Sequence, residues 1–132
     1  MTRINTISVQ ELHTKHLVAE YRELPRIFGV AKKAEERGFL PATYKIPDNF
    51  TLGTGHVKFF SNKLLFLINR FNDLVAKCQA RGINVQHTSV NYNNMPKNKL
   101  WFNDWIPTEE SKRLIRERIA ERIDSKPKAY LN

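Results

Sequence analysis

Two short stretches of the chain carry residue types that can do chemistry together. The chain starts with Met1 and the small residue Thr2, and a small second residue allows an aminopeptidase to remove the methionine. The α-amine then exposed on Thr2 is nucleophilic near neutral pH, because its reference pKa is about 7.7–8.0, well below that of lysine. Some twenty residues later the carboxylate of Glu23 lies between Arg22 and Arg26. An amine, an acid and two guanidiniums are suited to chemistry on a phosphodiester polymer.

The composition is that of a basic globular chain. Its 132 residues are enough for a single domain, residues 1–132, with one hydrophobic core, and 41% hydrophobic with 27% charged residues is typical of a soluble protein. Twenty-two Lys and Arg against thirteen Asp and Glu give a net charge of +9, and the pI is about 9.9. This excess of positive charge indicates a polyanionic partner, nucleic acid before an anionic membrane surface.

Several features narrow the class of protein further. No stretch approaches the roughly 18 apolar residues of a membrane span, and the sequence shows no leader, so we expect a cytoplasmic protein with no membrane partner. The single cysteine, Cys78, excludes an internal disulfide and a cysteine-based metal site, and we expect it to be buried. The histidines and acidic residues form no metal-ligand pattern, so we expect no metal and no cofactor.

Hydrophobic periodicity predicts an all-α fold, a single compact domain of three main helices with long irregular connections. The first helix is predicted to begin at the capping-box pattern of Ser8–Glu11 and to run to about Arg37, where Gly38 ends it. Pro25 lies inside this helix and is expected to bend or split it. Residues 38–56, which contain several Pro and Gly residues, are predicted to form a connection.

Two further helices are predicted downstream. The second spans roughly residues 57–81 and ends at Gly82. Its buried stripe is predicted to be Leu64, Leu67, Ile68, Phe71, Leu74, Val75 and Cys78. Residues 83–107 are polar and aromatic and are predicted to be loop with short turns. The third helix is capped by Thr108 and ends before Lys126. Its predicted buried stripe is Ile115, Ile119 and Ile123.

A helical wheel sorts the first predicted helix into two faces. The basic residues that fall on one line are Lys15 and, within about 20° of it, Arg22, Arg26 and Lys33. The apolar residues on nearly the opposite side are Leu17, Tyr21, Leu24 and Phe28. His16 and Glu23 lie at the border of the two faces. Four cations in a line can track a phosphate backbone, although a solvated helix face, a Glu23–Arg26 surface pair and a structural His16 would give the same pattern.

Three segments form a specific signature. They are MTRIN at residues 1–5, HLVAEYRELPRIFG at residues 16–29 and LGTGHVKFF at residues 52–60. Together with the helix end at residues 71–82 and the Ile106-Pro107 start of the last helix, they closely resemble the phage endonuclease V-type pyrimidine dimer DNA glycosylases, which are also abasic-site lyases. The resemblance covers nearly the whole chain and weakens at residues 83–104 and after residue 126.

The resemblance implies a repair reaction on cyclobutane pyrimidine dimers, which UV light forms in DNA. The α-amine of Thr2 attacks C1′ of the sugar that carries the 5′ pyrimidine, the glycosidic bond breaks, and an imine joins enzyme to sugar. Because the imine makes the C2′ proton acidic, β-elimination then cuts the strand 3′ to that sugar. Glu23 is expected to stabilise the positive charge that develops on the sugar and to move protons, with Glu20 as the fallback.

The resemblance also implies which residues bind DNA. They are Arg3, His16, Arg22, Arg26, Lys33, Arg118 and Arg122. Arg22 and Arg26 are expected to clamp phosphates around the damaged step, because forked guanidinium donors suit phosphate oxygens. Arg3 would hold the amino-terminal arm and a nearby phosphate or base, and His16 would orient the sugar or share the proton network. Lys33 would extend the backbone track, and the two arginines of the last helix match basic positions of the family.

The resemblance also implies an amino-terminal arm packed between helices. It implies a monomer that acts on double-stranded DNA containing dimers or abasic sites. In the family the DNA is kinked and an adenine opposite the lesion is flipped into a protein pocket, whose lining the sequence does not assign. The chain departs from the family at Lys15, where the best-known relative has an uncharged side chain. Its tail, residues 126–132, lacks the aromatic-rich end of the phage relatives.

Three other interpretations remain open. A glycosylase or abasic-site lyase with a different lesion preference would share Thr2 and Glu23 and differ in its pocket. A non-catalytic, basic helical DNA-binding protein would need only the line of cations. A basic protein that binds an acidic partner or a membrane would show no preference for damaged DNA.

Overall fold

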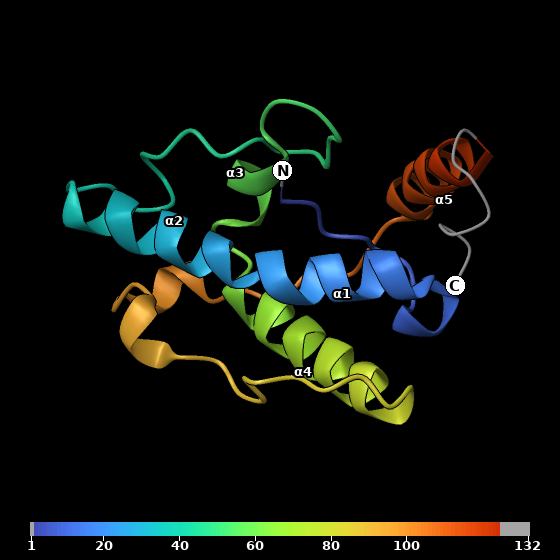
Figure 1. Ribbon diagram of the computed structural model, residues 1–132. Coiled ribbons are helices and arrows are strands. Elements are labelled where there is room, and N and C mark those ends of the chain that lie inside the picture. Colours follow the sequence, from blue (N-terminus) through green and yellow to red (C-terminus); the bar gives the residue numbers. More distant parts are fainter. Residues whose placement is uncertain (1, 125–132) are drawn as a thin grey trace.

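The computed structural model describes residues 2–124 and is built from helices joined by long connections (Figure 1). Its α-helices are α1 (Thr14–Glu23), α2 (Pro25–Glu36), α3 (His56–Phe60), α4 (Leu64–Ala80) and α5 (Glu109–Asp124). Its short 3₁₀ helices are η1 (Val9–Glu11), η2 (Tyr92–Asn94) and η3 (Lys99–Trp101). Within residues 2–124 extended pairing is limited to an isolated antiparallel bridge between Lys63 and Phe102. The predicted all-α fold class is confirmed.

The first predicted helix is split at Pro25 into α1 and α2. A proline has no N–H to donate, and its ring would clash with the carbonyl of Tyr21, four residues earlier, so the helix cannot continue unbroken. Leu24 keeps helical angles, with φ −52° and ψ −43°, and caps the end of α1 and the beginning of α2. Pro25 then occupies the first position of α2, where the missing N–H would have no partner in any case.

The start of the first helix differs from the prediction. Ser8 accepts a hydrogen bond from the Gln10 N–H at 3.2 Å, but it caps only the short η1. A capping box requires the Glu11 side chain to reach back toward Ser8, whereas the two Glu11 oxygens accept hydrogen bonds from Arg116 of α5 at 2.9 and 3.1 Å. Helix α1 therefore begins at Thr14 rather than near Ser8.

The second predicted helix is also interrupted, and α3 and α4 are separated by residues 61–63. This stretch pairs with the segment that precedes α5, because the Asn103 N–H donates to the Asn62 carbonyl at 3.4 Å. The Asn103 carbonyl in turn accepts the N–H of Phe66, in the first turn of α4, at 3.3 Å. Such an N–H has no partner within its own helix, so a distant segment supplies the cap that begins α4.

Both predicted glycine stops are confirmed. Gly38 after α2 and Gly82 after α4 have φ of +92° and +75°, the left-handed region that glycine adopts most readily. The chain then turns back on the helix end, because the Phe39 N–H donates to the Ala34 carbonyl at 3.0 Å. The Ile83 N–H does the same to the carbonyl of Cys78 at 2.9 Å.

The hydrophobic core lies along the contact between α4 and α1, and α2 adds further side chains to it. Figure 1 shows α1 and α2 running end to end, with α4 beneath α1. The predicted stripe of α4 is buried, with Ile68 only partly covered, and Cys78 is buried as expected. From α1 and α2 the core receives Leu17, Leu24, Ile27, Phe28, Ala31 and Ala34. Each large apolar side chain contributes about 1.5–3 kcal/mol when it is fully buried.

Helix α5 docks on the molecule through a narrow apolar face. Thr108 caps the helix as predicted, because its Oγ1 accepts the N–H of Ser111 at 3.0 Å. Ile115 and Ile119 are buried, in agreement with the predicted stripe. The third member of that stripe is Ile123, whose side chain lies outside the described part of the structure. The tail, residues 126–132, also lies outside the described residues.

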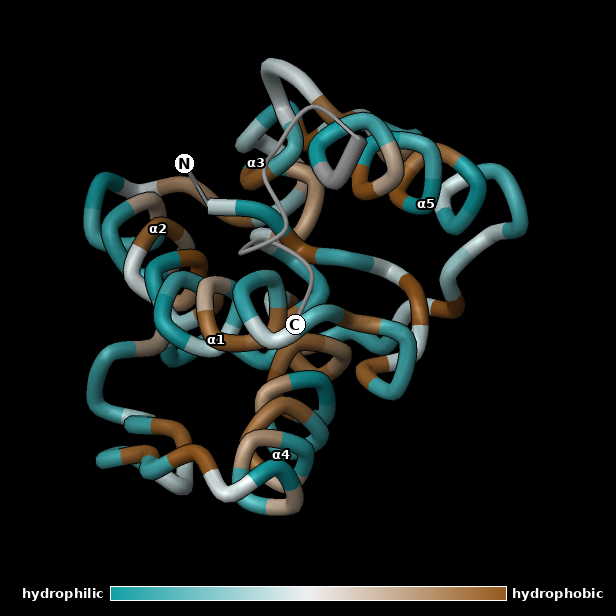
Figure 2. Tube along the Cα trace, turned by 45° about the vertical axis from the view of Figure 1, so that its right-hand side comes forward, coloured by the Kyte–Doolittle hydropathy of each residue, from teal (hydrophilic) through white to brown (hydrophobic). Residues whose placement is uncertain are grey.

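The amino-terminal arm, residues 2–7, runs as an extended segment between α1 on one side and α3 and α5 on the other (Figures 1 and 2). Ile4 is fully buried, and its N–H donates to Nε2 of His56 at 2.9 Å. The other ring nitrogen of His56 donates to the Thr51 carbonyl at 2.8 Å, so the imidazole is neutral. Burial lowers the pKa of His56 to about 4. The predicted packing of the arm between helices is therefore observed, and His56 is one of its anchors.

We predict that replacing His56 with glutamine will reduce the loss of stability in mild acid. An unfolded histidine binds a proton near pH 6.5, whereas folded His56 has a pKa of about 4. The stability that the neutral ring contributes is therefore complete above pH 6.5 and falls as the pH drops toward 4, by roughly 3 kcal/mol. The amide oxygen of the glutamine could still accept the arm's N–H, but the new side chain would not titrate. Urea unfolding at several pH values measures the difference.

The exposed His87 provides the matched control, because His87→Gln should keep the parent's slope of unfolding free energy between pH 6.5 and 4. If His56→Gln lost stability as steeply as the parent, another group would have to be responsible.

Candidate active site and nucleic-acid interface

The two faces predicted for the first helix are present in the structure. The cations Lys15, Arg22, Arg26 and Lys33 are all exposed. Leu17, Leu24 and Phe28 are buried on the other side, and half-buried Tyr21 stacks on Phe71 of α4 with ring centroids 5.6 Å apart. Because Pro25 divides the helix, the basic line begins on α1 and continues on α2.

A cleft of about 240 Å³ gathers five of the nine predicted site residues. Its lining comes from the arm, α1 and α5 and consists of Arg3, Asn5, His16, Ala19, Glu20, Glu23, Arg118, Ile119 and Arg122. The other α1 residues lie three, four and seven positions after His16, so they share one face of the helix. The two arginines of α5 are four positions apart, one helical turn, and face the same cleft.

Burial and neighbouring charges perturb two of the residues in the cleft. Burial lowers the pKa of Arg3, and the positive charges of Arg118 and Arg122 lower it further. The pKa of His16 is lowered first by burial and then by His13 and the same two arginines. His16 is therefore neutral at pH 7 and able to accept a proton or a hydrogen bond. The convergence of cations gives the cleft a positive potential that attracts anions.

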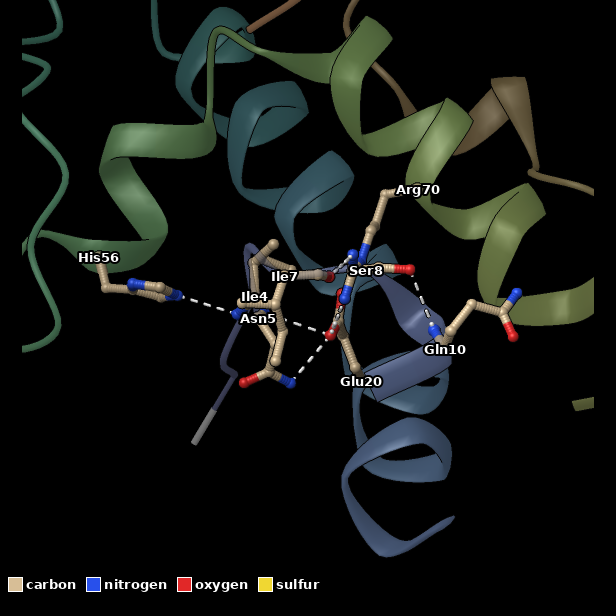
Figure 3. Close-up of polar contacts among 8 residues, drawn as sticks. All are labelled: Ile4, Asn5, Ile7, Ser8, Gln10, Glu20, His56 and Arg70. Atoms are coloured by element: carbon tan, nitrogen blue, oxygen red, sulfur yellow. Dashed lines mark hydrogen bonds and ion pairs between the residues drawn. The ribbon is translucent and has the colours of Figure 1, made fainter. Parts of the chain in front are cut away.

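Two glutamates line the cleft in different surroundings. Glu20 is 1% exposed and accepts hydrogen bonds from Arg70 of α4, from Nε at 2.7 Å and from Nη2 at 3.0 Å. Asn5 adds its backbone N–H at 3.2 Å and its side-chain NH₂ at 2.9 Å (Figure 3). Glu23, one turn later on α1, is partly exposed at the cleft. The Glu20 carboxylate is thus committed to holding the arm, whereas Glu23 belongs to the cleft.

The remaining predicted residues lie outside this lining. Thr2 is buried and directly precedes Arg3 of the cleft. Arg22 lines a second, larger cavity. Arg26 and Lys33 are exposed on α2 and, among the described residues, contribute to neither lining. The basic line and the cleft are therefore separate features that both involve α1.

Helix α5 places its cations in two kinds of environment. Arg113 forms ion pairs with Glu110 and Glu117 on the exposed side of the helix. Arg116 pairs with Glu11 of η1 at 2.9 Å. The two arginines that face the cleft, named above, lie on another side of α5. Helix α5 thus presents arginines both to the surface and to the cleft.

The second cavity has a volume of about 890 Å³ and lies between the α1–α2 junction, α4 and residues 84–94. Its apolar lining consists of Tyr21, Pro25, Phe28, Phe71, Val85 and Val90. Its polar lining consists of Arg22, Asn84, Gln86, His87, Ser89, Asn91, Asn93 and Asn94. Aromatic rings beside amide groups can stack on a planar heterocycle and hydrogen-bond to its edge.

The sequence predicts loop with short turns for the segment that forms this cavity, and it does not predict the cavity. The segment is fixed by contacts with distant residues: the Tyr21 hydroxyl accepts the His87 N–H at 3.0 Å and donates to the His87 carbonyl at 2.8 Å. Lys32 donates to the Asn93 carbonyl at 3.0 Å. The several Asn residues between positions 84 and 94 are the signal in the sequence for a polar binding segment. They do not indicate which helices the segment contacts.

Two other kinds of feature are lacking from the described part of the chain. Within residues 2–124, no group of three or more His, Cys, Asp or Glu side chains lies close enough together to hold a metal ion. No helix in that range combines the length and the apolar character needed to cross a membrane.

The sequence matches a known protein family. A family model described as pyrimidine dimer DNA glycosylase matches residues 1–91, more than half of the 132-residue chain. The matched part contains the arm, the helices α1 to α4 and the Glu23 side of the cleft, whereas α5 and its two cleft arginines lie beyond it. Because the match covers more than half of the chain, the chain belongs to the pyrimidine dimer DNA glycosylase family.

Proposed function

We propose that this chain is a bifunctional glycosylase and abasic-site lyase acting on UV-induced cyclobutane pyrimidine dimers in duplex DNA. The α-amine of Thr2 is the nucleophile and Glu23 is the acid–base group. The observation that carries the proposal is the small cleft in which Glu23 lies with Arg3 of the arm and with Arg118 and Arg122 of α5. A carboxylate and several cations next to the first residues of the chain suit an amine that attacks a DNA sugar.

The reaction begins once Met1 has been removed. The lone pair of the Thr2 nitrogen forms a bond to C1′ while the bond from C1′ to the 5′ pyrimidine breaks, and the departing base takes up a proton. Opening of the sugar ring turns the adduct into an imine. Loss of the C2′ proton then expels the 3′ phosphate, because the imine accepts the electron pair, and the strand is nicked. The Glu23 carboxylate stabilises positive charge on the sugar and carries the protons.

The surroundings of the two cleft glutamates favour Glu23 over Glu20 for this role. Glu20 already accepts four hydrogen bonds, two from Arg70 and two from Asn5. Moving a proton onto it would break the buried ion pair, which is strongly unfavourable. Glu23 and neutral His16 both line the cleft, and His16 is suited to orient the sugar or relay a proton.

The cations support binding to DNA in two ways. In the cleft, Arg3, Arg118 and Arg122 bring positive charge to the point where a phosphate next to the damaged sugar would lie. The exposed line on α1 and α2, which includes Arg26 and Lys33, is suited to follow the phosphate backbone away from the lesion.

The larger cavity supports a site for the extrahelical adenine opposite the dimer. Arg22 belongs to the lining of this cavity, and its neighbour Glu23 belongs to the lining of the cleft, so the two spaces flank one end of α1. Tyr21, Phe28 and Phe71 provide aromatic surface for the base, and the Asn and Gln side chains provide hydrogen-bonding groups for its edge. Removing the partner base from the stack would open a path for the amine to reach the sugar.

We predict that borohydride will trap a covalent complex between the protein and abasic-site DNA, because it reduces an imine to a stable amine. Peptide mass spectrometry should map the DNA adduct to Thr2, and intact mass should show that Met1 is absent. Added chelator should not change the yield. A variant with one extra residue before Thr2 should lose trapping, because such reactions tolerate little displacement of the nucleophile. Trapping at a lysine would rule out the Thr2 amine.

We predict that Glu23→Gln will separate binding from catalysis. The substituted glutamine keeps the size and much of the polarity of the side chain but cannot carry a proton as a carboxylate does. Dimer-containing duplex should bind within about threefold of the parent, whereas single-turnover incision should slow by roughly 100-fold or more. Glu36→Gln, at an exposed glutamate on α2, serves as the control and should match the parent. Parent-like incision by Glu23→Gln would assign the proton transfers elsewhere.

We predict that filling the larger cavity will block incision only when a base must enter it. Ser89→Trp places an indole in the cavity, whereas Thr88→Trp changes an exposed neighbour outside the lining. Incision of a dimer opposite adenine should fall by about tenfold or more in Ser89→Trp alone, since the displaced base loses its site. 2-Aminopurine opposite the dimer should brighten with the parent and with Thr88→Trp but not with Ser89→Trp.

An abasic nucleotide opposite the dimer provides the decisive comparison. It presents no base to be accommodated, so Ser89→Trp should regain the parent's rate on that duplex. A defect that persisted would mean that the indole disturbs the site in another way, and the cavity would not be the base site.

A further inference from the structure

The amino-terminal arm is held by side chains that come from three different helices. At Ile4 the backbone N–H is bound by His56 of α3, and at Asn5 both the backbone N–H and the side-chain amide are bound by Glu20 of α1 (Figure 3). An extended segment has no ladder of its own, so these contacts, together with the hydrogen bond from the Arg3 guanidinium to the Leu52 carbonyl, hold it in place.

Arg70 of α4 connects two of these attachments. Its Nε and Nη2 bind the two oxygens of Glu20 at 2.7 and 3.0 Å, the paired geometry that a guanidinium forms with a carboxylate. Its Nη1 donates to the Ile7 carbonyl at 2.5 Å. One side chain therefore fixes the carboxylate that binds Asn5 and, directly, the last residue of the arm. Figure 3 shows Arg70 reaching Glu20 and Ile7 together.

The buried ion pair is poorly explained as a source of stability alone. The Arg70 and Glu20 side chains are 8% and 0% exposed. Removing two charges from water costs much of what their attraction returns, and well-packed apolar residues often serve stability as well or better. Nor is Arg70 available as a phosphate clamp, because each of its three nitrogens already donates to a protein oxygen.

We propose that Arg70 is a positioning residue for the amino-terminal nucleophile, acting through Glu20 and the backbone of the arm; this inference rests on the proposed function. Thr2 lies three residues before Asn5, a length of roughly 10 Å of extended chain. A shift of the anchor at Asn5 is therefore passed along this short stretch, through Ile4 and Arg3, to the terminal nitrogen. A displacement of about 1 Å is enough to cost roughly 100-fold in rate when two reacting atoms must be aligned.

Arg70→Lys tests the inference while keeping a cation in place. An ammonium group cannot bind both Glu20 oxygens and the Ile7 carbonyl in the same planar arrangement. With enzyme in excess over abasic-site DNA, the rate of borohydride-trapped imine formation should fall roughly 10- to 100-fold. The dissociation constant for the same DNA should stay within about twofold, because the cations of the interface are untouched.

Two further variants separate positioning from loss of stability. Val75→Ala removes buried apolar atoms from α4, and neither valine nor alanine can hydrogen-bond to the arm. If its melting temperature falls about as much as that of Arg70→Lys, Val75→Ala should still form the imine at the parent's rate. The double variant Arg70→Met/Glu20→Gln buries no unpaired charge and is the alternative if Arg70→Lys fails to fold. Its imine formation should remain at least about tenfold slow, since the arm loses the Arg70 contact at Ile7.

The outcomes distinguish this inference from the function on which it rests. If the parent is trapped at Thr2 and either Arg70 variant forms the imine at the parent's rate, the positioning role is overturned and the proposed function stands. The same holds if Val75→Ala slows imine formation as much as Arg70→Lys does. If the parent itself is not trapped, the proposed function fails and the positioning role fails with it.

Discussion

The site depends on holding an extended piece of chain in the interior without secondary structure of its own. Residues 2–7 form neither helix nor strand, so side chains must satisfy their buried backbone groups. His56, Glu20 and Arg70 do so from three helices. The position of the first residues of the chain is therefore set by how α1, α3 and α4 pack together. A terminal segment would ordinarily fray, and here it is attached to the same helices that form the core.

This attachment also explains how two glutamates one turn apart on α1 differ in character. Glu20 faces Arg70 and Asn5, and its charge is balanced and fully hydrogen-bonded. Glu23 lies beyond the reach of that network, at a cleft shared with Arg3 and the arginines of α5. One helix face thus supplies a structural carboxylate for the arm and a second carboxylate for the cleft. Because the two glutamates are one turn apart on the same helix, the position of the arm is fixed relative to Glu23.

Sequence reasoning succeeded where the controlling interaction is local. The effects of Pro25, Gly38 and Gly82 depend only on the backbone beside them, and all three were predictable. It failed where a distant residue competes, as when Arg116, 105 positions away, takes the side chain that would have completed the Ser8 capping box. For the same reason the partner of Glu20, fifty positions away, and the cavity formed by residues 84–94 were not predictable. The sequence pattern predicts which residues are buried or charged, but it does not predict which of them are in contact.

The cations show why net charge alone does not identify a DNA site. Arg70 is buried against a carboxylate, and Arg113 is paired with glutamates on the surface, so neither adds much to the field outside. Arg118 faces a cleft in which other cations already lower the pKa of Arg3. Gathering like charges there costs free energy, which a bound phosphate offsets. Under the proposed function, the cleft arginines hold the strand beside Glu23 and the arm, and the exposed line of cations on α1 and α2 extends that contact over the surface.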